Sequence, residues 1–167
     1  LVEDERFAAA FRNRFGDERA DYGAALSQHY DNGPPQGWQD NHITEYASSH
    51  PHEDWAETFA HLVHLTDMID SANATGLRQS STSVPDPYRT SDGDAVISAG
   101  ANLGIAFNHV NRSMGLFDLY PFVIAPAVRD KLAFIRAAVA AGPRESAKPK
   151  RRNWNPFKAA PVRAGRT

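Results

Sequence analysis

The sequence has no cysteine among its 167 residues and no long hydrophobic run. The absence of cysteine excludes disulfide bonds, thiolate zinc fingers, iron–sulfur clusters and a cysteine nucleophile within this chain. No apolar stretch approaches the roughly 20 residues that cross a bilayer, so we expect no transmembrane segment. Several catalytic motifs are also missing, namely His-Glu-x-x-His, Gly-x-Ser-x-Gly, a phosphate-binding glycine-rich loop and a dinucleotide-binding motif. What is present is a globular composition, with 41% hydrophobic and 23% charged residues.

Charge is distributed unevenly along the chain. Residues 143–167 carry eight basic side chains and one acidic side chain, a net charge of +7, which leaves −9 on residues 1–142. We therefore predict a helical body over residues 1–141 and a basic, proline-rich, disordered tail over residues 142–167. The tail is either a solvated terminus or a weak contact for an anionic partner, such as nucleic acid or a membrane surface. Composition leaves both interpretations open.

Hydrophobic residues recur at spacings of three and four in several segments, and this pattern predicts a mainly α fold without long strands. The predicted helices cover residues 1–15, 17–30, 51–73, 95–114 and 125–141. Asp17 is expected to cap the second of these helices. Pro51 suits the first turn of the third helix, and Gly76 is expected to follow its end.

The helix predicted over residues 51–73 has two chemically different faces. Trp55, Phe59 and Leu62 lie on the face that we expect to join the core. The opposite face carries side chains that bind metals or move protons, namely Glu53, Glu57 and His64, with His61 at its edge. Ligands from a single helix seldom surround a metal ion, so a zinc site here requires a second element.

Three blocks of the sequence resemble the bacterial "putative zinc-binding metallopeptidase" family. They are FGDERADY at residues 15–22, YASSHPHEDWAE at residues 46–57, and NHVNRSMG followed by DLYPF within residues 108–122. Members of this family carry a His-Glu-x-x-His helix shortly before the region that resembles residues 1–4, and many carry a cysteine-rich zinc ribbon further upstream. Neither feature is in this sequence. The resemblance thus implies the helical C-terminal part of a zincin-like, gluzincin-type catalytic domain, and we expect the chain to be an N-terminally truncated piece.

The resemblance also implies roles for four residues. Glu53 would be a zinc ligand, and Glu57, one helical turn later, would orient a metal-bound histidine. Tyr46 would hydrogen-bond the developing oxyanion, and His50 would lie near the site. Each residue also has a structural alternative. Glu53 suits an N-terminal capping box, Glu57 a polar surface, Tyr46 packing over the helix start and His50 a helix-start position.

The function implied by the resemblance is zinc-dependent hydrolysis of peptide or protein substrates by the intact protein. Zn²⁺ would be held there by Glu53 and by two histidines that this chain lacks. The sequence leaves open whether the chain itself is an enzyme, and we expect it alone to have no peptidase activity and to bind zinc weakly or not at all. The alternative is a non-enzymatic, degenerate family member that acts as an interaction module through residues 143–167. The expected location is the bacterial cytoplasm.

Overall fold

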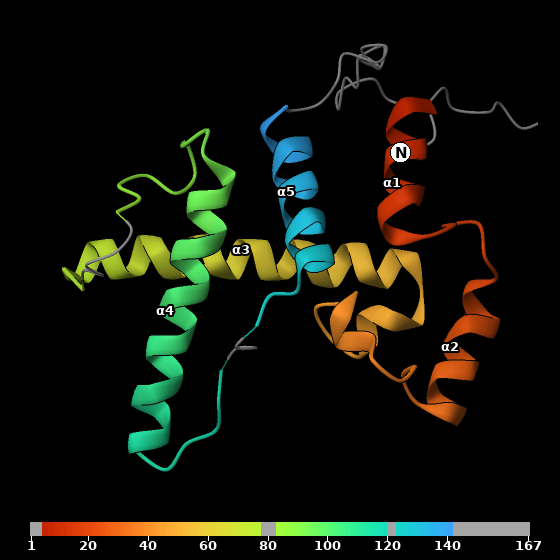
Figure 1. The fold of residues 1–167 in the computed structure, drawn as a ribbon, viewed down its shortest axis with the longest axis horizontal. Coiled ribbons are helices and arrows are strands. Elements are labelled where there is room, and N and C mark those ends of the chain that lie inside the picture. The colour runs from red at the N-terminus through yellow and green to blue at the C-terminus, as the bar shows by residue number, and fades with distance from the viewer. Residues whose placement is uncertain (1–4, 78–82, 120–122, 142–167) are drawn as a thin grey trace, which may run out of the picture.

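The described part of the chain folds mainly into helices, as Figure 1 shows. The computed structural model describes residues 5–77, 83–119 and 123–141. These residues form five α-helices and two short 3-10 helices, without a strand: α1 (Glu5–Phe15), α2 (Tyr22–Asn32), η1 (Trp38–Asp40), η2 (Tyr46–Ser49), α3 (Pro51–Thr75), α4 (Gly93–Ser113) and α5 (Pro126–Ala140). The prediction of a mainly α fold is confirmed. The tail predicted over residues 142–167 lies outside the described residues.

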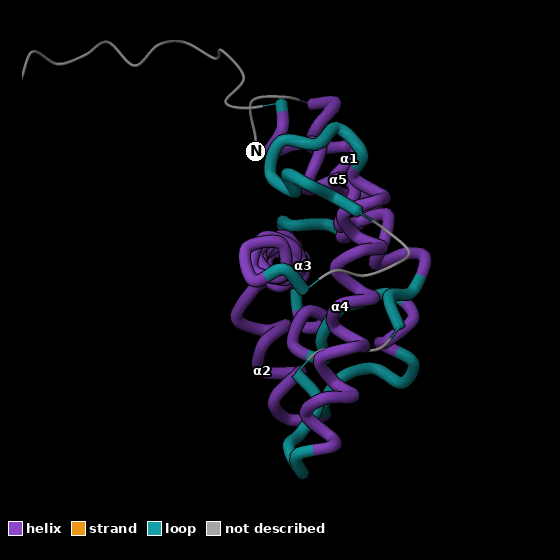
Figure 2. The backbone as a smooth tube through the Cα atoms, turned by 90° about the vertical axis from the view of Figure 1, so that its left-hand side faces the viewer, coloured by secondary structure: helices purple, strands orange, loops and turns teal. Residues whose placement is uncertain are grey.

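The longest helix, α3, is the element around which the others are arranged. It contacts α1, α4, α5 and η2, and it runs across the molecule in Figure 1 and is seen end-on in Figure 2. Pro51 occupies its first turn, where a missing N–H costs no hydrogen bond. Gly76 ends the helix with a φ of +75°, a left-handed conformation that glycine adopts without strain. The predictions that Pro51 lies in the first turn of this helix and that Gly76 follows its end are both confirmed.

The start of α2 differs from the prediction. Asp17 does not cap this helix, because its carboxylate is held in the preceding turn by the backbone N–H of Arg19 at 3.0 Å and by the guanidinium of Arg19 at 2.7 Å. These hydrogen bonds hold the pKa of Asp17 well below its usual range. The cap is Asp21, whose Oδ1 accepts a hydrogen bond from the backbone N–H of Ala24 at 2.9 Å. Helix α2 therefore begins at Tyr22.

Aromatic side chains from α1, α3 and α5 form one end of the core. The rings of Phe11 and Phe15 stack with centroids 4.9 Å apart, and Trp55 lies 5.6 Å from Phe11. Phe134 of α5 closes the cluster against Phe15 and Trp55. This packing joins three helices without any covalent cross-link.

Phe59 is not part of the core, and the prediction that it would be is wrong. Its side chain is 41% exposed, whereas Leu62 is 5% exposed. Phe59 lies about 60° around the helix from Leu62, which places it at the edge of the buried face. The periodicity identified which side of α3 is buried. It did not show how wide a face of α3 the neighbouring helices cover.

Helix α4 crosses α3 at short range where α4 has a glycine, Gly100. A Cβ atom at Gly100 would lie 2.8 Å from the Cβ of Leu65, closer than packed side chains allow. Glycine at this position therefore permits the close approach of the two helices.

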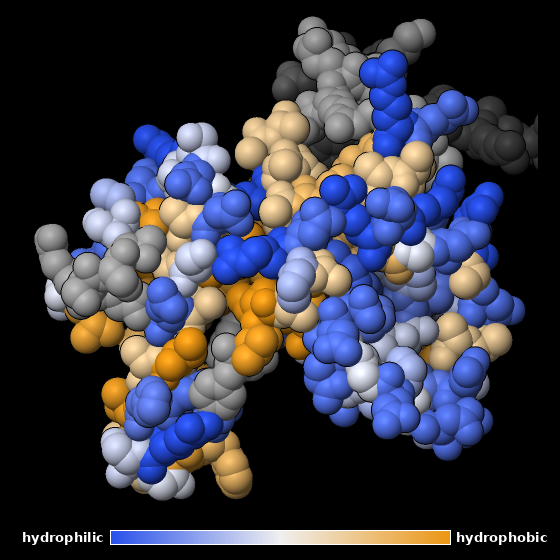
Figure 3. Space-filling model, viewed as in Figure 1, coloured by the Kyte–Doolittle hydropathy of each residue, from blue (hydrophilic) through white to orange (hydrophobic). Residues whose placement is uncertain are grey.

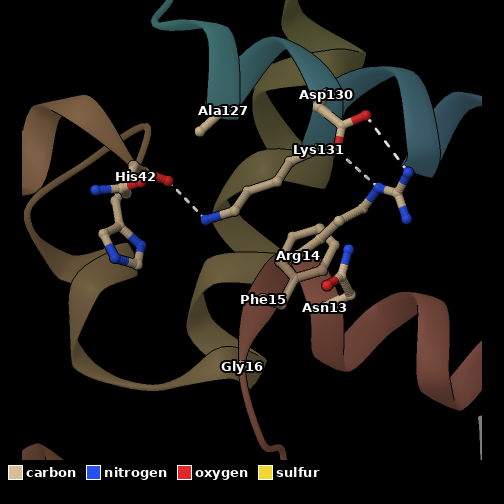
Figure 4. Close-up of a pocket in the computed structure, with 9 residues that line it drawn as sticks. Asn13, Arg14, Phe15, Gly16, His42, Ala127, Asp130 and Lys131 are labelled. Carbon is tan, nitrogen blue, oxygen red and sulfur yellow. Dashed lines mark hydrogen bonds and ion pairs between the residues drawn. The ribbon is translucent and has the colours of Figure 1, made fainter.

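A buried ion pair connects α3 to α5 and to the connection that precedes η2. The Nζ of Lys131 donates to Oδ2 of Asp54 at 2.5 Å and to the backbone oxygen of Asn41 at 2.6 Å. The hydroxyl of Thr58 donates to the other carboxylate oxygen of Asp54 at 3.3 Å. Figure 4 shows Lys131 pointing toward the connection that carries His42, along a hollow of about 340 Å³. Asp54 is fully buried, and Nδ1 of His42 also lies 3.2 Å from its Oδ2.

Polar contacts hold the end of α4 in the block that resembles the family. Oδ1 of the buried Asn108 accepts a hydrogen bond from the backbone N–H of Leu119 at 2.7 Å. Arg112 pairs with Asp118 through two hydrogen bonds of 2.8 Å. The described part of this block therefore stabilises the turn after α4, while residues 120–122 lie outside the described residues.

The surface divides into a hydrophobic and a hydrophilic region. Figure 3 shows hydrophobic side chains gathered over α4 and beneath α3, whereas the side of the molecule formed by α2 is hydrophilic. The exposed apolar residues at the end of α4 are Val110, Met114, Leu116 and Phe117. Within the described ranges, no helix is long and apolar enough to cross a membrane.

Candidate metal centre

Glu53 lies in the first turn of α3, where the helix meets the chain that follows η2. His50 caps this helix, because its Nδ1 accepts a hydrogen bond from the backbone N–H of His52 at 3.1 Å. Glu53 does not act as the partner in a capping box, since its carboxylate is bound elsewhere. The side chain is half-buried and points toward α2.

The carboxylate of Glu53 is held by a residue that the sequence analysis did not identify. The hydroxyl of Tyr22, the first residue of α2, donates a short hydrogen bond to Oε1 of Glu53. This hydrogen bond, followed by burial and by the negative charge of Glu53, raises the pKa of Tyr22 to about 12. In the part of the chain that the structure describes, no other donor bonds to this carboxylate. One carboxylate oxygen is therefore occupied, and Oε2 has no such bond.

Tyr46 lies in η2 and shares the electrostatic environment of Glu53. Burial raises the pKa of Tyr46, and the negative charge of Glu53 is the next largest cause. Its ring also lies 6.0 Å from the ring of His29 in α2. The structure thus brings Tyr46, Tyr22 and Glu53 into one region.

Glu57 connects α3 to the segment that carries Tyr46. Its Oε2 accepts a hydrogen bond from the hydroxyl of Thr44 at 3.0 Å. The same hydroxyl accepts a hydrogen bond from the backbone N–H of Ala47, also at 3.0 Å. Glu57 therefore positions the start of η2. The sequence analysis predicted a different role, the orientation of a metal-bound histidine. That predicted role stays a prediction.

His50 lies close to the site but is fully engaged in structural contacts. Its Nε2–H donates to the backbone oxygen of Ala20 at 3.2 Å, while its Nδ1 caps α3. The imidazole is 3% exposed and packs edge-on against Tyr22, with ring centroids 5.1 Å apart. His50 thus contacts the residue that holds Glu53 and has no ring nitrogen left for a metal.

The described residues fit one ligand of a zinc site and not a complete site. Within these ranges, no group of three histidine, cysteine, aspartate or glutamate residues could hold a metal ion. His61 donates from Nδ1 to the backbone oxygen of Glu57 at 2.8 Å, and burial lowers its pKa. Glu53 is different, since a carboxylate with one oxygen held and the other without a hydrogen bond can bind a metal through the second oxygen. At least two further ligands would have to come from outside the described chain.

Replacing Glu53 by glutamine should return the pKa of Tyr22 from about 12 toward its usual value near 10. Because folding raises this pKa, the hydrogen bond stabilises the protein at pH values below about 10, and its contribution is lost as the pH rises through 12. Ultraviolet absorbance of tyrosinate, followed during alkaline titration, measures the shift. Tyr88, whose pKa is raised to about 12 by a hydrogen bond to Asp67, is the internal reference. Identical titration curves for the wild-type protein and the variant would contradict the assignment.

The chain matches the profile of a family described as "putative zinc-binding metallo-peptidase" over residues 1–138. Its relatives include an uncharacterized protein of Mycobacterium bovis (strain ATCC BAA-935 / AF2122/97) and uncharacterized proteins of two Mycobacterium tuberculosis strains, CDC 1551 / Oshkosh and ATCC 25618 / H37Rv. Each is 45% identical over 140 residues, which is 83% of this chain and 41% of the relative. The chain thus spans about two fifths of the length of these curated relatives. No solved structure matches it.

The family match extends over nearly all of the described helices and includes the whole of the candidate site. It therefore confirms the resemblance carried by the sequence blocks around Tyr22, Glu53 and Asn108. The relatives are uncharacterized and add no activity to the family description. The chain belongs to the family of putative zinc-binding metallo-peptidases.

Proposed function

We propose that this chain is part of a zinc-dependent metallopeptidase, in which Glu53 supplies one of the zinc ligands. The observation that carries the proposal is the state of the Glu53 carboxylate, whose Oε1 is held by Tyr22 and whose Oε2 receives no hydrogen bond from the described residues. Two histidine ligands and a general base would come from outside this chain, as the family resemblance implies. Zinc bound there would polarise a water molecule for attack on a peptide carbonyl.

The residues of this chain would bind the substrate and stabilise charge. Tyr46 lies in the environment of Glu53, and its phenol is protonated at neutral pH, as is usual for tyrosine, so it can donate to a carbonyl oxygen as negative charge develops. Glu57 would keep Tyr46 in place through Thr44. A surface hollow of about 350 Å³ lies between α2 and the residues that follow Tyr46. Neither Glu53 nor Tyr46 lines this hollow, so it adds no support to the proposed chemistry.

The alternative function, an interaction module without catalysis, rests on residues 143–167. These residues lie outside the described ranges, so no contact in the structure favours the alternative. The two functions differ in one measurable property. A zinc peptidase requires stoichiometric metal, whereas an interaction module does not.

Replacing Glu53 by glutamine in the full-length gene product that contains this sequence should weaken zinc binding by about 100-fold or more. This expectation exceeds the roughly 10–100-fold loss that follows removal of an outer partner of a metal ligand, since Glu53 would touch the metal itself. Zinc content after purification and competition with a chromogenic chelator measure the effect. Peptidase activity is expected to fall in parallel.

The matched control is Glu5→Gln, which changes an exposed glutamate in the first turn of α1. It removes the same charge from the first turn of another helix without touching the site. Zinc affinity that is unchanged in the Glu53 variant would refute the proposed function. A full-length protein that contains no zinc would refute it as well and favour the interaction module.

A further inference from the structure

The contact between α2 and the first turn of α3 is made by a tyrosine whose position is fixed from two sides. Tyr22 is the first residue of α2, directly after the cap formed by Asp21 and Ala24. This cap sets where the helix starts and therefore where the phenol of Tyr22 projects. The hydroxyl ends at Oε1 of Glu53, 31 residues further along the chain.

The second support of Tyr22 is the imidazole of His50. The two rings meet edge to face, with centroids 5.1 Å apart and an interplanar angle of 77°. His50 is itself immobilised, because Ala20 binds one ring nitrogen and the backbone of His52 binds the other. A buried ring with both nitrogens bound gives Tyr22 a rigid surface to pack against.

We propose that Tyr22 is the positioning residue for Glu53, holding Oε1 so that Oε2 is the oxygen presented to the metal. This inference rests on the proposed zinc-binding role of Glu53 and assigns the residue that orients the ligand. A free glutamate side chain has three rotatable bonds, and ordering it costs affinity at the moment of binding. The hydrogen bond from Tyr22 orders the carboxylate beforehand. It also disfavours binding of the metal by both oxygens at once.

A second tyrosine of the chain makes the same hydrogen bond away from the site. The hydroxyl of Tyr88 donates to Oδ1 of Asp67 in α3 at 2.7 Å, and Tyr88 is 58% exposed against 43% for Tyr22. Both contacts join a tyrosine to a carboxylate on the same helix. Asp67 lies almost four helical turns beyond Glu53, so Tyr88→Phe removes an equivalent hydrogen bond without touching the candidate ligand.

The experiment compares Tyr22→Phe and Tyr88→Phe in the zinc-loaded, full-length protein. Competition with a chelator should show that Tyr22→Phe weakens zinc binding by about 10–100-fold, the usual loss for an outer partner of a ligand. Tyr88→Phe should leave the affinity unchanged within about twofold, as expected for a surface substitution. The visible spectrum of the cobalt-substituted protein should change in the Tyr22 variant alone, because the released carboxylate can then bind through both oxygens. A purely structural role would not alter this spectrum.

A second variant keeps the test decisive if Tyr22→Phe folds poorly. His50→Asn retains a good capping residue at the start of α3 and removes the ring that supports Tyr22, so the zinc affinity should fall here too. If both variants fold and bind zinc as tightly as the wild-type protein, with the cobalt spectrum unchanged, the positioning role is overturned. The proposed function then still stands, provided that Glu53→Gln has lost its zinc. If Glu53→Gln retains zinc, the proposed function is refuted, and the positioning role of Tyr22, which depends on it, is refuted as well.

Discussion

Replacing Lys131 by methionine is expected to lower the free energy of unfolding by about 3–5 kcal/mol. Lys131 is 4% exposed and is bound to Asp54, which is fully buried. Removing the ammonium group leaves a buried carboxylate whose remaining partners are the hydroxyl of Thr58 and the imidazole of His42, 3.2 Å from Oδ2. Neither carries the permanent charge of a lysine. Since domains of this size are stable by about 5–15 kcal/mol in total, the variant should be severely destabilised. Unfolding in urea, followed by circular dichroism, measures the change.

Arg129→Met is the matched control, since it changes a cation two positions earlier in the same helix. Arg129 pairs with Asp94 at 3.2 Å on the surface, where an ion pair contributes at most about 1 kcal/mol. Replacing Asp54 by leucine together with Lys131→Met should restore much of the stability, because no unpaired charge is then buried. A loss of less than about 1 kcal/mol in the single Lys131 variant would show that the pair does not stabilise the fold.

Replacing Phe11 by alanine is expected to cost a similar amount, about 3–5 kcal/mol. The side chain is 1% exposed and stacks on Phe15 with Trp55 beside it. Its removal opens a cavity where α1, α3 and α5 meet, and neighbouring rings cannot fill that space without leaving their own contacts. The midpoint of urea unfolding should decrease, while the slope of the free energy of unfolding against urea concentration stays the same.

Phe117→Ala provides the comparison for Phe11→Ala, because the deleted atoms are identical. Phe117 is 95% exposed, so its removal should change the free energy of unfolding by no more than about 0.5 kcal/mol. The difference between the two variants isolates the contribution of burial. Equal losses in both variants would contradict the assignment of Phe11 to the core.

Much of the helical architecture could be predicted because its signals are local. Pro51 and Gly76 determine the ends of α3 through their own backbone preferences. Asp17 and Asp21 are both good capping residues, and the sequence alone could not decide between them. The choice depended on Arg19, which binds the carboxylate of Asp17 in the turn before α2.

The candidate site could be predicted only in part. Resemblance pointed to Glu53, Glu57 and Tyr46, and the structure brings these residues to the junction of α2, η2 and α3. The resemblance could not identify Tyr22 as a partner of Glu53, although Tyr22 lies within the first matching block. A tyrosine at a helix start has no periodic pattern that indicates what its hydroxyl binds.

The sequence by itself determined the helices of this protein, its amphipathic faces and the family to which it belongs. The helices and their faces depend on residues within a few positions of one another, where helical geometry relates spacing to direction. Only the tertiary structure decided which polar groups meet, as in the pairs Tyr22–Glu53 and Asp54–Lys131, separated by 31 and 77 residues. Periodicity states which way a side chain points, but its partner depends on how the helices pack against one another.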